Sequence, residues 1–517
     1  MTFKKTYDQS TSVVVCLVNP PQLSTPYQVT DGLMPPLGIM FLSAVLKKEG
    51  FDVHVIDAPG EAPTNRYEHD DIPLRGLGIE AIIKSIPEGT RLVGIAGIFS
   101  MNHHVLMELA RSIKKRFPDV IVVVGGSHAT AVAEHVLTSR DVDVVCLGEA
   151  ERSLAALCHV LERNGWRTVP ADLSGIAGIA YRDGKRIVVN RDVELIDDVD
   201  ALPYPDWESV PMETYYTSKE ANGPVWTDRW VPLLSSRGCP YDCAFCSTPA
   251  IWRRRWRPRD PIKLVDEIAW LQREHGIQEV HFEDENMSTD PKRLEAFCDE
   301  LVRRDIGIKW QAANGMRAHG FDGELLTKMV ASGCTNLVLA PESGSRDLLR
   351  EGLNKDIDLD EIVRAGRTAH GIGLRTSTFF MMGMPGETRR DVARTLAYLM
   401  RLAFAGVDEC DISQFVPLPG SSLFDRLRSE GRIELDDAFF RSLTSMGDLS
   451  SSRSWSEHYS NPELKIYQLI GLGLFHITRL VSHPVSTART FANVLKGRQE
   501  LKSERFLISK LRRLRGR

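Results

Sequence analysis

Three cysteines lie close together in the stretch SSRGCPYDCAFCSTP (235–249). Cys239, Cys243 and Cys246 are a third of the nine cysteines in the chain, and the loop offers no fourth cysteine and no histidine. Structural zinc usually takes four protein ligands, and iron–sulfur clusters also normally receive four thiolates. Three thiolates on a cluster of four irons would leave one iron without a protein ligand. We therefore expect that open position to bind a substrate or cofactor.

Acidic residues and a glycine turn follow further apolar stretches. FEDENMS (282–288) and APESGS (340–345) place carboxylates directly after predicted strands, and RTSTFFMMGMPGET (375–388) ends in a glycine- and proline-containing turn. Acids after strands often cap helices, and Gly-Pro-Gly sequences often form turns, so each stretch alone is a weak signal. Because the three stretches follow the cysteine loop in order, each strengthens the case that the others belong to the same site. The basic stretch WRRRWRPRD (252–260) offers cations for an anionic group, but a solvated surface explains most of its arginines equally well.

The elements that position these residues alternate between strand and helix. From VPLLSSRGC (231–239) to ECDISQFVP (409–417), six apolar strands are separated by helical stretches. Six βα units over residues 233–435 predict a partial or complete parallel barrel of the (β/α)6 TIM type, whose site lies at the carboxyl ends of the strands. The cysteine loop, the acidic stretches and the glycine turn all follow strands, so we expect them at that end.

The first part of the chain shows the same alternation. Apolar runs such as SVVVCLVN (12–19) and VIVVVGGS (120–127) predict strands buried on both faces. Over residues 1–196 the pattern predicts an α/β domain with a doubly wound, Rossmann-like parallel sheet and a hairpin at GIAYRDGKRIVVN (178–190). Residues 197–232 have no sustained period and predict a linker, and residues 436–517 are predicted to be a helical C-terminal region.

Composition limits the class of protein. A chain of 517 residues is too long for one core, and its 43% hydrophobic and 26% charged residues are typical of a soluble globular protein. A formal charge of −5 argues against a general nucleic-acid binder. The N-terminal apolar run is too short for a signal peptide or membrane span, and scattered cysteines fit a reducing compartment. We expect a cytoplasmic protein.

The end of the chain departs from this average. Residues 496–517 hold nine Lys or Arg against two Glu, behind the apolar run IYQLIGLGLF (466–475), which by itself is too short to span a bilayer. A basic segment behind an apolar helix allows peripheral contact with an anionic membrane. A packed terminal helix with a solvated basic end is the alternative that we favour.

The spacing Cys-x3-Cys-x2-Cys, with the aromatic Phe245 before the third cysteine, resembles the signature of the radical S-adenosylmethionine (SAM) superfamily. The resemblance implies a [4Fe-4S] cluster on the three cysteines, with SAM on the fourth iron through its amino and carboxyl groups. It also implies a flavodoxin- or ferredoxin-type electron donor. The contacts implied for SAM are Phe245 before the third cysteine, Glu283, Asp284 and Glu285 near the amino group, Glu342 and Ser343 at the ribose, Arg375 toward the carboxylate and Gly383 toward adenine.

The first domain resembles the cobalamin-binding domain that precedes many radical SAM cores. The contacts implied for cobalamin are Asn19, Ser100, Gly125, Gly126, Ser127, Gly148 and Glu149. Glycine lacks a Cβ, so Gly125 and Gly126 would allow close approach of the nucleotide tail. The Asp-x-His-x-x-Gly motif that supplies a cobalt ligand is absent, and NPPQLS stands in its place, so we expect no histidine on cobalt from there. His103, His104 and His128 are further candidates, although ordinary polar contacts explain them as well.

Together the resemblances cover residues 12–430 and imply a class B, cobalamin-dependent radical SAM methyltransferase. It would methylate an unactivated carbon of a small molecule (lipid-like, tetrapyrrole or natural product) through a 5′-deoxyadenosyl radical and methylcobalamin; no catalytic side chain is assigned. A radical SAM cyclase or rearrangement enzyme with the same architecture is the alternative. A methylthiotransferase is a further rival, but it should carry a second set of three cysteines and a β-rich C-terminal domain. A non-catalytic iron–sulfur or corrinoid carrier would leave the SAM motifs without a purpose.

Overall fold

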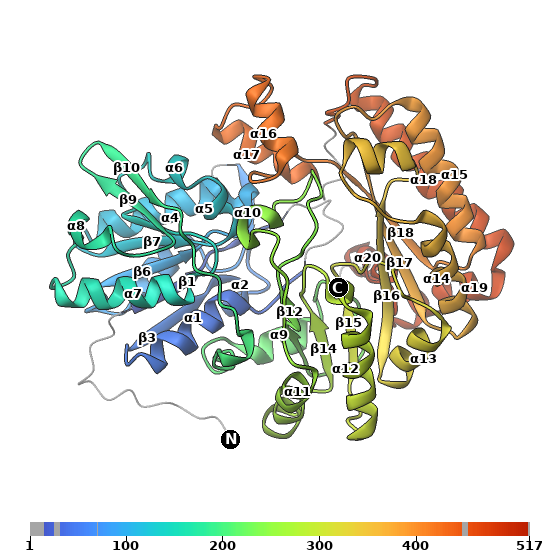
Figure 1. The fold of residues 1–517 in the computed structure, drawn as a ribbon, viewed down its shortest axis with the longest axis horizontal. Helices are drawn as coiled ribbons and strands as arrows, with labels where there is room; N and C mark the ends of the chain where they lie inside the picture. Colours follow the sequence, from blue (N-terminus) through green and yellow to red (C-terminus); the bar gives the residue numbers. More distant parts are fainter. Residues whose placement is uncertain (1–14, 25–31, 70, 447–452, 515–517) are drawn as a thin grey trace.

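The computed structural model describes residues 15–24, 32–69, 71–446 and 453–514. Figure 1 shows two α/β halves side by side, the first built on a seven-stranded sheet and the second on a six-stranded sheet. Helices α16 (Ser422–Ser429) and α17 (Asp437–Ser442) lie over the junction of the two halves.

The seven-stranded sheet has the strand order β10-β9-β8-β7-β6-β1-β3. Its five parallel strands are almost entirely buried, which explains their continuous apolar sequences. The predicted hairpin adds two antiparallel strands at one edge. The strands are β1 (Val15–Asn19), β3 (Val53–Asp57), β6 (Leu92–Ala96), β7 (Ile121–Gly125), β8 (Val144–Cys146), β9 (Ile179–Asp183) and β10 (Arg186–Asn190).

Helices connect these strands, and a small three-stranded sheet of order β2-β5-β4 lies beside them. The helices are α1 (Leu37–Lys48), α2 (Ala58–Glu61), α3 (Ile79–Ser85), α4 (His103–Arg116), α5 (Ser127–Ala131), α6 (Ala133–Val136), α7 (Ala150–Arg163) and α8 (Pro170–Leu173). The small sheet consists of β2 (Gln22–Leu23), β4 (Arg66–His69) and β5 (Ile72–Arg75).

The second sheet is fully parallel, with the order β11-β14-β15-β16-β17-β18 that follows the sequence. Its two edge strands, β11 and β18, do not pair, so the barrel is partial and has an open seam. The predicted fold class is confirmed. The strands are β11 (Trp230–Leu233), β14 (Glu279–Phe282), β15 (Lys309–Ala312), β16 (Cys334–Glu342), β17 (Arg375–Met382) and β18 (Glu409–Gln414).

Local signals fix the helices of the barrel. Helix α11 (Pro261–His275) begins after Asp260, whose carboxylate accepts hydrogen bonds from the next turn, and ends at Gly276 in a left-handed conformation. Helix α12 (Pro291–Arg303) begins in the same way after Asp290. The other helices of the barrel are α10 (Thr248–Trp252), α13 (Gly323–Ala331), α14 (Leu359–Gly371) and α15 (Arg389–Phe404).

The segment between the two sheets has more secondary structure than the sequence predicts. Helix α9 (Met212–Ser218) and the start of β11 lie within the predicted linker. The C-terminal region is helical, as predicted, with α18 (Asn461–Ser482), α19 (Pro484–Lys496) and α20 (Lys502–Leu514).

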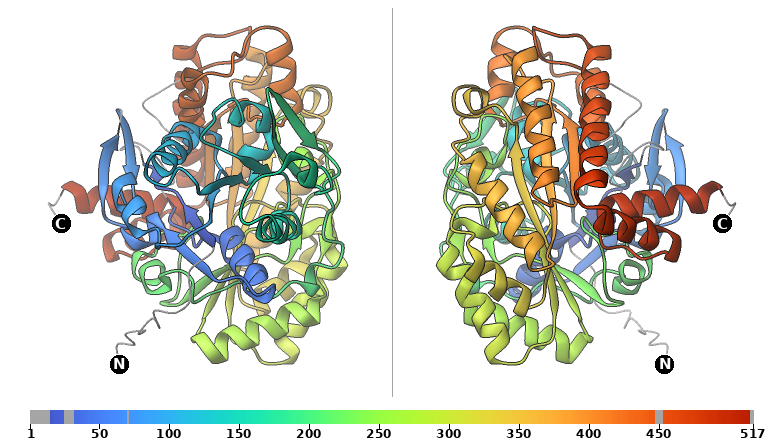
Figure 2. Two further views of the ribbon diagram at one scale, coloured as in Figure 1. Left: turned by 90° about the vertical axis from the view of Figure 1, so that its left-hand side faces the viewer. Right: turned by 90° about the vertical axis from the view of Figure 1, so that its right-hand side faces the viewer.

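Helix α18 corrects the reading of the apolar run 466–475, because the helix has 22 residues. Among the described residues it is the one helix long and apolar enough to cross a membrane by length and composition, and 33% of its apolar window is buried inside the protein. Figure 2 shows α18 beside α15 along the outside of the barrel sheet, where Gly471 permits close contact with Leu399 and Ile412.

Candidate active site

The cysteine loop follows β12 (Ser236–Arg237) at the carboxyl end of the barrel. Cys239, Cys243 and Cys246 are all partly buried and unpaired. Burial, with smaller contributions from the neighbouring Cys246 and Cys243, raises the pKa of Cys239 to about 11. Binding to iron requires the thiolate form, so a cluster in this loop would displace the thiol protons.

Two segments distant in sequence hold the cysteine loop. The Ala244 N–H donates to the Leu353 carbonyl at 2.8 Å, and the Asn354 side chain donates to the Asp242 carbonyl at 2.8 Å. On the other side, the Leu423 N–H donates to the Ala244 carbonyl at 2.9 Å. These hydrogen bonds fix the loop through its backbone and do not involve the three sulfurs.

Two cations that the sequence analysis missed lie beside the cysteines. Lys355 is 6% exposed and pairs with Glu342 at 2.8 Å, with its ammonium 5.6 Å from the ring centre of Phe245. Arg317 stacks on Tyr241 and lies 3.8 Å from the Cys243 sulfur. Their positive charge suits a site for an anionic thiolate-bound cluster.

The three acidic residues after β14, Glu283, Asp284 and Glu285, have different roles. Asp284 accepts hydrogen bonds from the Ser235 N–H and hydroxyl at 2.7 Å, and Glu285 accepts one from the Gly238 N–H at 3.0 Å. Both carboxylates thus hold the strand that leads into the cysteine loop. Glu283 instead has one buried carboxylate oxygen without a hydrogen-bond partner among the described residues. It is the member of this stretch with an oxygen open to a ligand.

The other residues predicted to contact SAM differ in whether they face an open site. Glu342 ends β16 and has a φ of +65°, an unusual value for a residue with a side chain and one that occurs at functional sites. Gly383 begins its turn with a φ of +90°, and its N–H donates to Glu387 and Tyr459, each at 2.7 Å. Ser343 is fully buried, and its hydroxyl bonds with Thr395 at 3.1 Å, so it does not face an open site.

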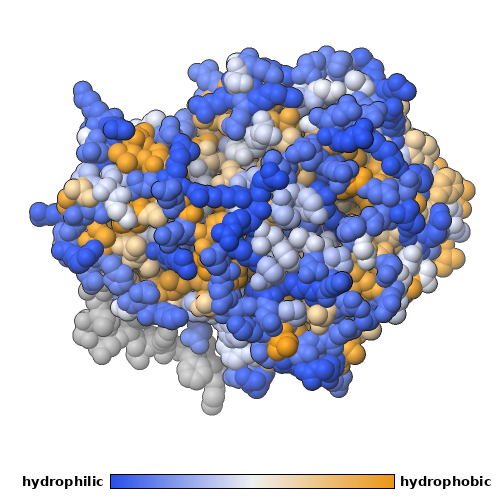
Figure 3. Space-filling view, viewed as in Figure 1, coloured by the Kyte–Doolittle hydropathy of each residue, from blue (hydrophilic) through white to orange (hydrophobic). Residues whose placement is uncertain are grey.

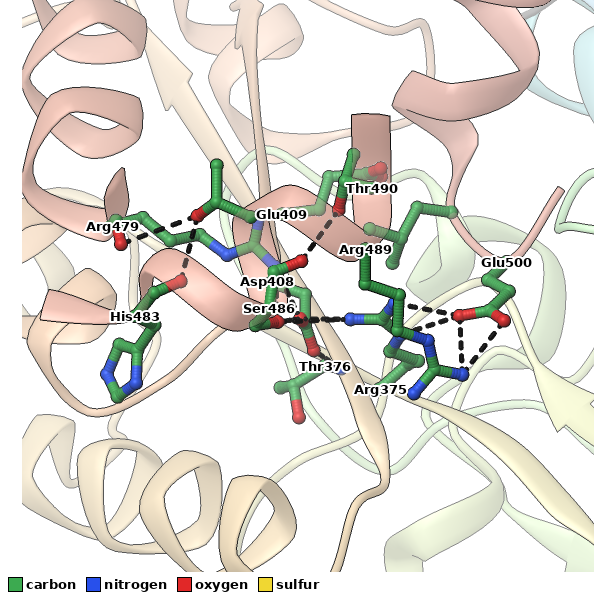
Figure 4. A network of polar contacts seen from close by, with 12 residues as sticks. Arg375, Thr376, Asp408, Glu409, Arg479, His483, Ser486, Arg489, Thr490 and Glu500 are labelled. Atoms are coloured by element: carbon green, nitrogen blue, oxygen red, sulfur yellow. Dashed lines mark hydrogen bonds and ion pairs between the residues drawn. The ribbon is translucent and has the colours of Figure 1, made fainter. Parts of the chain in front are cut away.

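Arg375 corrects the prediction of a carboxylate contact. It is the first residue of β17, so it lies at the amino end of the barrel, away from the cysteine loop. Its guanidinium pairs with Asp408 at 2.6 Å and with Glu500 at 2.7 Å (Figure 4). Lys355 and Arg317 are the cations that the structure brings to the cysteine loop instead.

A cavity of about 420 Å³ lies between the two halves of the protein. Its lining on the first half includes Gly125, Gly126, Ser127, Gly148 and Glu149, as predicted for cobalamin, and its lining on the second half includes Glu285 and Trp252.

Small residues keep the cavity open. Gly126 has a φ of +107°, and a Cβ there would lie 2.7 Å from the Gly97 carbonyl oxygen. Gly94, which the sequence analysis missed, lines the cavity on the face of the sheet, where a Cβ would lie 2.9 Å from Leu17. A glycine-lined cavity against a parallel sheet suits a bulky group that lies along the backbone.

Asn19 and Ser100 are not among the residues that line this cavity. The Asn19 side chain donates to Asp57 at 2.8 Å, and the Ser100 hydroxyl bonds with His128 at 3.0 Å. His128 in turn contacts His103 at 2.9 Å, and both imidazoles are buried. Among the residues that the structure describes, no histidine lines the cavity.

A buried ion network joins the wall of the cavity to the cysteine loop. Arg237 pairs with Glu149 at 2.8 Å and with Glu151 at 2.7 Å, and its guanidinium lies 4.9 Å from the ring centre of Phe41. Arg257 binds the other carboxylate oxygen of Glu149 at 2.5 Å. Since Arg237 precedes Gly238 and the first cysteine, the network fixes the position of one site relative to the other.

Comparisons with known proteins agree with this geometry. A model of the radical SAM superfamily matches residues 233–399, and a model of the B12 binding domain matches residues 27–158. A cytidylyl-2-hydroxyethylphosphonate methyltransferase from Streptomyces wedmorensis is 29% identical over 457 residues, covering 81% of this chain and 83% of the relative. An anaerobic magnesium-protoporphyrin IX monomethyl ester cyclase from Cereibacter sphaeroides is 29% identical over 404 residues, covering 77% of this chain and 61% of the relative.

A solved structure shares the fold. TsrM from Kitasatospora setae, a radical SAM methyltransferase with cobalamin and a [4Fe-4S] cluster bound, has a TM-score of 0.63 at 19% identity, covering 81% of this chain and 78% of its own. The chain belongs to the cobalamin-dependent, class B radical SAM enzymes. Its cofactors are a [4Fe-4S] cluster, SAM and cobalamin, and the cysteine loop and the glycine-lined cavity fit the first and the last.

Proposed function

We propose that the protein is a methyltransferase that uses SAM and cobalamin to methylate an unactivated carbon of a small molecule. The observation that carries this proposal is the shared wall of the cavity of about 420 Å³. The cavity is lined both by the glycine-rich edge of the first sheet and by Ser247, Thr248, Ile251 and Trp252 just after the third cysteine. A corrin in this cavity would lie beside the cluster site. When bound, the cluster supplies an electron for the cleavage of SAM and the cobalamin carries the methyl group.

The chain contributes positioning, charge and exclusion of water. Asp284 and Glu285 hold the entry to the cysteine loop, and Lys355 and Arg317 supply positive charge beside the sulfurs. The proposed ligands of the cluster are Cys239, Cys243 and Cys246. The SAM contacts that we propose are Phe245, Glu283, Glu342, Lys355 and Gly383, and those for cobalamin are Gly125, Gly126, Ser127, Gly148 and Glu149. Residues 1–196 and 233–435 are the proposed cobalamin-binding and radical SAM domains, joined by 197–232 and followed by 436–517.

A ring-closing reaction is the second candidate. The Cereibacter relative is a cyclase, and its sequence is as similar to this chain as that of the Streptomyces methyltransferase, at 29% identity for each. The two reactions differ in the mass of the product. The test is anaerobic incubation of the reconstituted protein with methyl-deuterated SAM and a metabolite extract from a strain that lacks the gene. A product that gains a labelled methyl group supports methylation, and a product that loses hydrogen without the label supports cyclisation.

A flavodoxin- or ferredoxin-type protein is the proposed electron donor, since the cluster must be reduced before SAM is cleaved. Dithionite-independent formation of 5′-deoxyadenosine with a purified flavodoxin and its reductase is the test. We further propose that the protein works in the cytoplasm.

Peripheral membrane contact through the C-terminal region stays a prediction. The feature that would make this contact is the exposed apolar face of α18, in place of the basic tail. Apolar side chains gather at the right-hand edge in Figure 3, over α18 and α19, and on α18 they range from Ile470 at 44% to Val481 at 73% exposed. Sedimentation with anionic vesicles tests the prediction, with Leu469→Asp as the variant. Equal and negligible pelleting of both proteins would remove it.

A further inference from the structure

The inner face of the barrel sheet is partly exposed from the middle to the carboxyl ends of β17 and β18. Alternate residues of a strand point to opposite faces. Phe380 contacts Tyr398 of α15 and Ile412 lies against Gly471 of α18, so both point to the outer, helix-covered face. Phe379, Met381, Asp411 and Ser413 therefore point inward, and all four are only partly buried, whereas their neighbours are buried.

Helix α20 covers the open seam of this barrel. At β18, the Ser503 N–H and hydroxyl both donate to Glu409 at 2.7 Å. On the segment before β11, Arg505 donates to the carbonyls of Ala221 and Gly223. The first turn of the helix thus links the edge strand β18 to the segment that precedes the other edge strand, β11.

A charged network anchors the start of α20 to the amino end of the barrel. Glu500 pairs with Arg375 at 2.7 Å and with Arg489 of α19 at 2.8 Å, and Arg375 also pairs with Asp408 (Figure 4). Glu504 accepts hydrogen bonds from the Glu500 and Leu501 N–H groups and from Asn493. These contacts place α20 firmly, and with it the first residue of the helix, Lys502.

Lys502 and Asp411 are opposite charges near each other without a close ion pair. The Lys502 ammonium lies 4.8 Å from the ring centre of Phe379, and its one hydrogen bond, to Asn222, is 3.5 Å long. Within the described ranges neither Lys502 nor Asp411 has an ion-pair partner within 4 Å. Burial lowers the pKa of Lys502 and raises that of Asp411, and each charge partly offsets the effect on the other. An unpaired charge in a partly dry site costs free energy, so a ligand that pairs with both would stabilise this arrangement.

We propose that Lys502 and Asp411 bind the head group of the substrate, and that this head group is a zwitterion of the α-amino acid type. The carboxylate would pair with Lys502 and the ammonium with Asp411. The proposal deepens the proposed function and rests on it, because the inner face of the barrel is where a substrate can meet the cluster site. The C-terminal helix then sets substrate specificity as well as closing the seam.

The same chemistry occurs in the methionyl end of SAM, so the experiment has two arms. Full-length protein, reconstituted with its cluster and loaded with cobalamin, is tested for binding of each of the twenty L-α-amino acids by thermal shift and calorimetry. In a second arm, SAM binding is measured by equilibrium dialysis. The variants are Lys502→Met, Lys502→Arg and Asp411→Asn, and Lys496→Met is the control because Lys496 is exposed in the same region.

At least one amino acid should bind the wild type, and Lys502→Met and Asp411→Asn should weaken it about tenfold or more, which is about 1.4 kcal/mol. Lys502→Arg should retain part of the binding, Lys496→Met all of it, and SAM binding should stay unchanged in every variant. Binding of no amino acid to the wild type overturns the proposal, and so does a loss of SAM affinity in Lys502→Met. Cobalamin content and SAM cleavage under dithionite are recorded in parallel, since they report the proposed function and do not depend on this head group.

Discussion

The Arg237 guanidinium binds the Glu149 carboxylate at 2.8 Å across the boundary between the two halves of the protein. Both side chains are almost completely buried, at 4% and 1% exposed. Glu149 lies at the start of α7, which lines the proposed cobalamin cavity, and Arg237 lies two residues before the first cysteine of the proposed cluster loop. One ion pair therefore sets the position of one cofactor site relative to the other.

Arg237→Met should destabilise the protein and weaken cobalamin retention. Removal of one partner leaves Glu149 and Glu151 with less compensation in a buried site, which costs about 3–5 kcal/mol. Urea unfolding and the cobalamin-to-protein ratio after desalting measure the two effects. The matched control is Arg255→Met, whose pair with Asp197 is exposed and should contribute less than about 1 kcal/mol. Equal losses for both variants would contradict the role of the buried pair.

Gly125 offers a graded test of the cobalamin cavity. A Cβ at this position would be 3.6 Å from Cys146, an ordinary contact, so Gly125→Ala should fold and bind cobalamin with a modest loss. Gly125→Leu should extend into the cavity and abolish binding, while the unfolding temperature of the cobalamin-free protein changes little. Gly175→Leu is the control, because nothing lies within 4 Å of a Cβ at that exposed glycine. Full cobalamin binding by Gly125→Leu would place the cofactor elsewhere.

The buried histidines make the free energy of unfolding depend on pH. Burial, with a smaller contribution from His135, lowers the pKa of His103 to about 4. Burial, with smaller contributions from His103 and His135, lowers the pKa of His128 to about 3. The unfolded chain binds protons on these imidazoles as the pH falls through about 6.5, whereas the folded protein does not. Stability should therefore fall between pH 6.5 and pH 4, by up to about 1.4 kcal/mol per pH unit for each group.

Urea unfolding at pH 7, 6 and 5 measures this slope. Asp437 and His104 lie near His103 and influence its pKa, so neither is mutated in this experiment. His128→Asn should reduce the slope even if it lowers stability at pH 7. An unchanged slope would show that His128 is protonated in the folded protein.

The positions of the histidines predict that none of them binds cobalt. Within the described part of the chain no histidine lines the cavity, and His128 is held by Ser100 and His103. In protein labelled with nitrogen-15 only at histidine, the electron paramagnetic resonance spectrum of bound cob(II)alamin should match that of unlabelled protein. A change in superhyperfine splitting on labelling would reveal a histidine on cobalt.

The sequence was sufficient for those features that depend on spacing and periodicity. The three cysteines, the six barrel strands and the glycines after β7 could be read directly because each is local. Arg375 was misassigned because its role depends on which end of β17 it occupies. The structure shows that β17 begins at Arg375, which places the side chain at the amino end of the barrel. Lys355, Arg237 and Lys502 were missed because their partners lie far away along the chain. No local signal indicates that Lys502 reaches the inside of the barrel.

The central claim is that the cysteine loop holds a cluster with one iron open to SAM, and its most direct measurement is electron paramagnetic resonance of the reduced, anaerobically reconstituted protein with and without SAM. In the wild type, SAM should change the spectrum of the cluster, and 5′-deoxyadenosine should form. In Cys239→Ala, Cys243→Ala and Cys246→Ala, iron binding, the SAM-dependent change and 5′-deoxyadenosine should all be lost, because three ligands leave no redundancy. A wild-type spectrum that SAM does not alter, or any one of these variants that keeps wild-type iron content and SAM cleavage, would contradict the account.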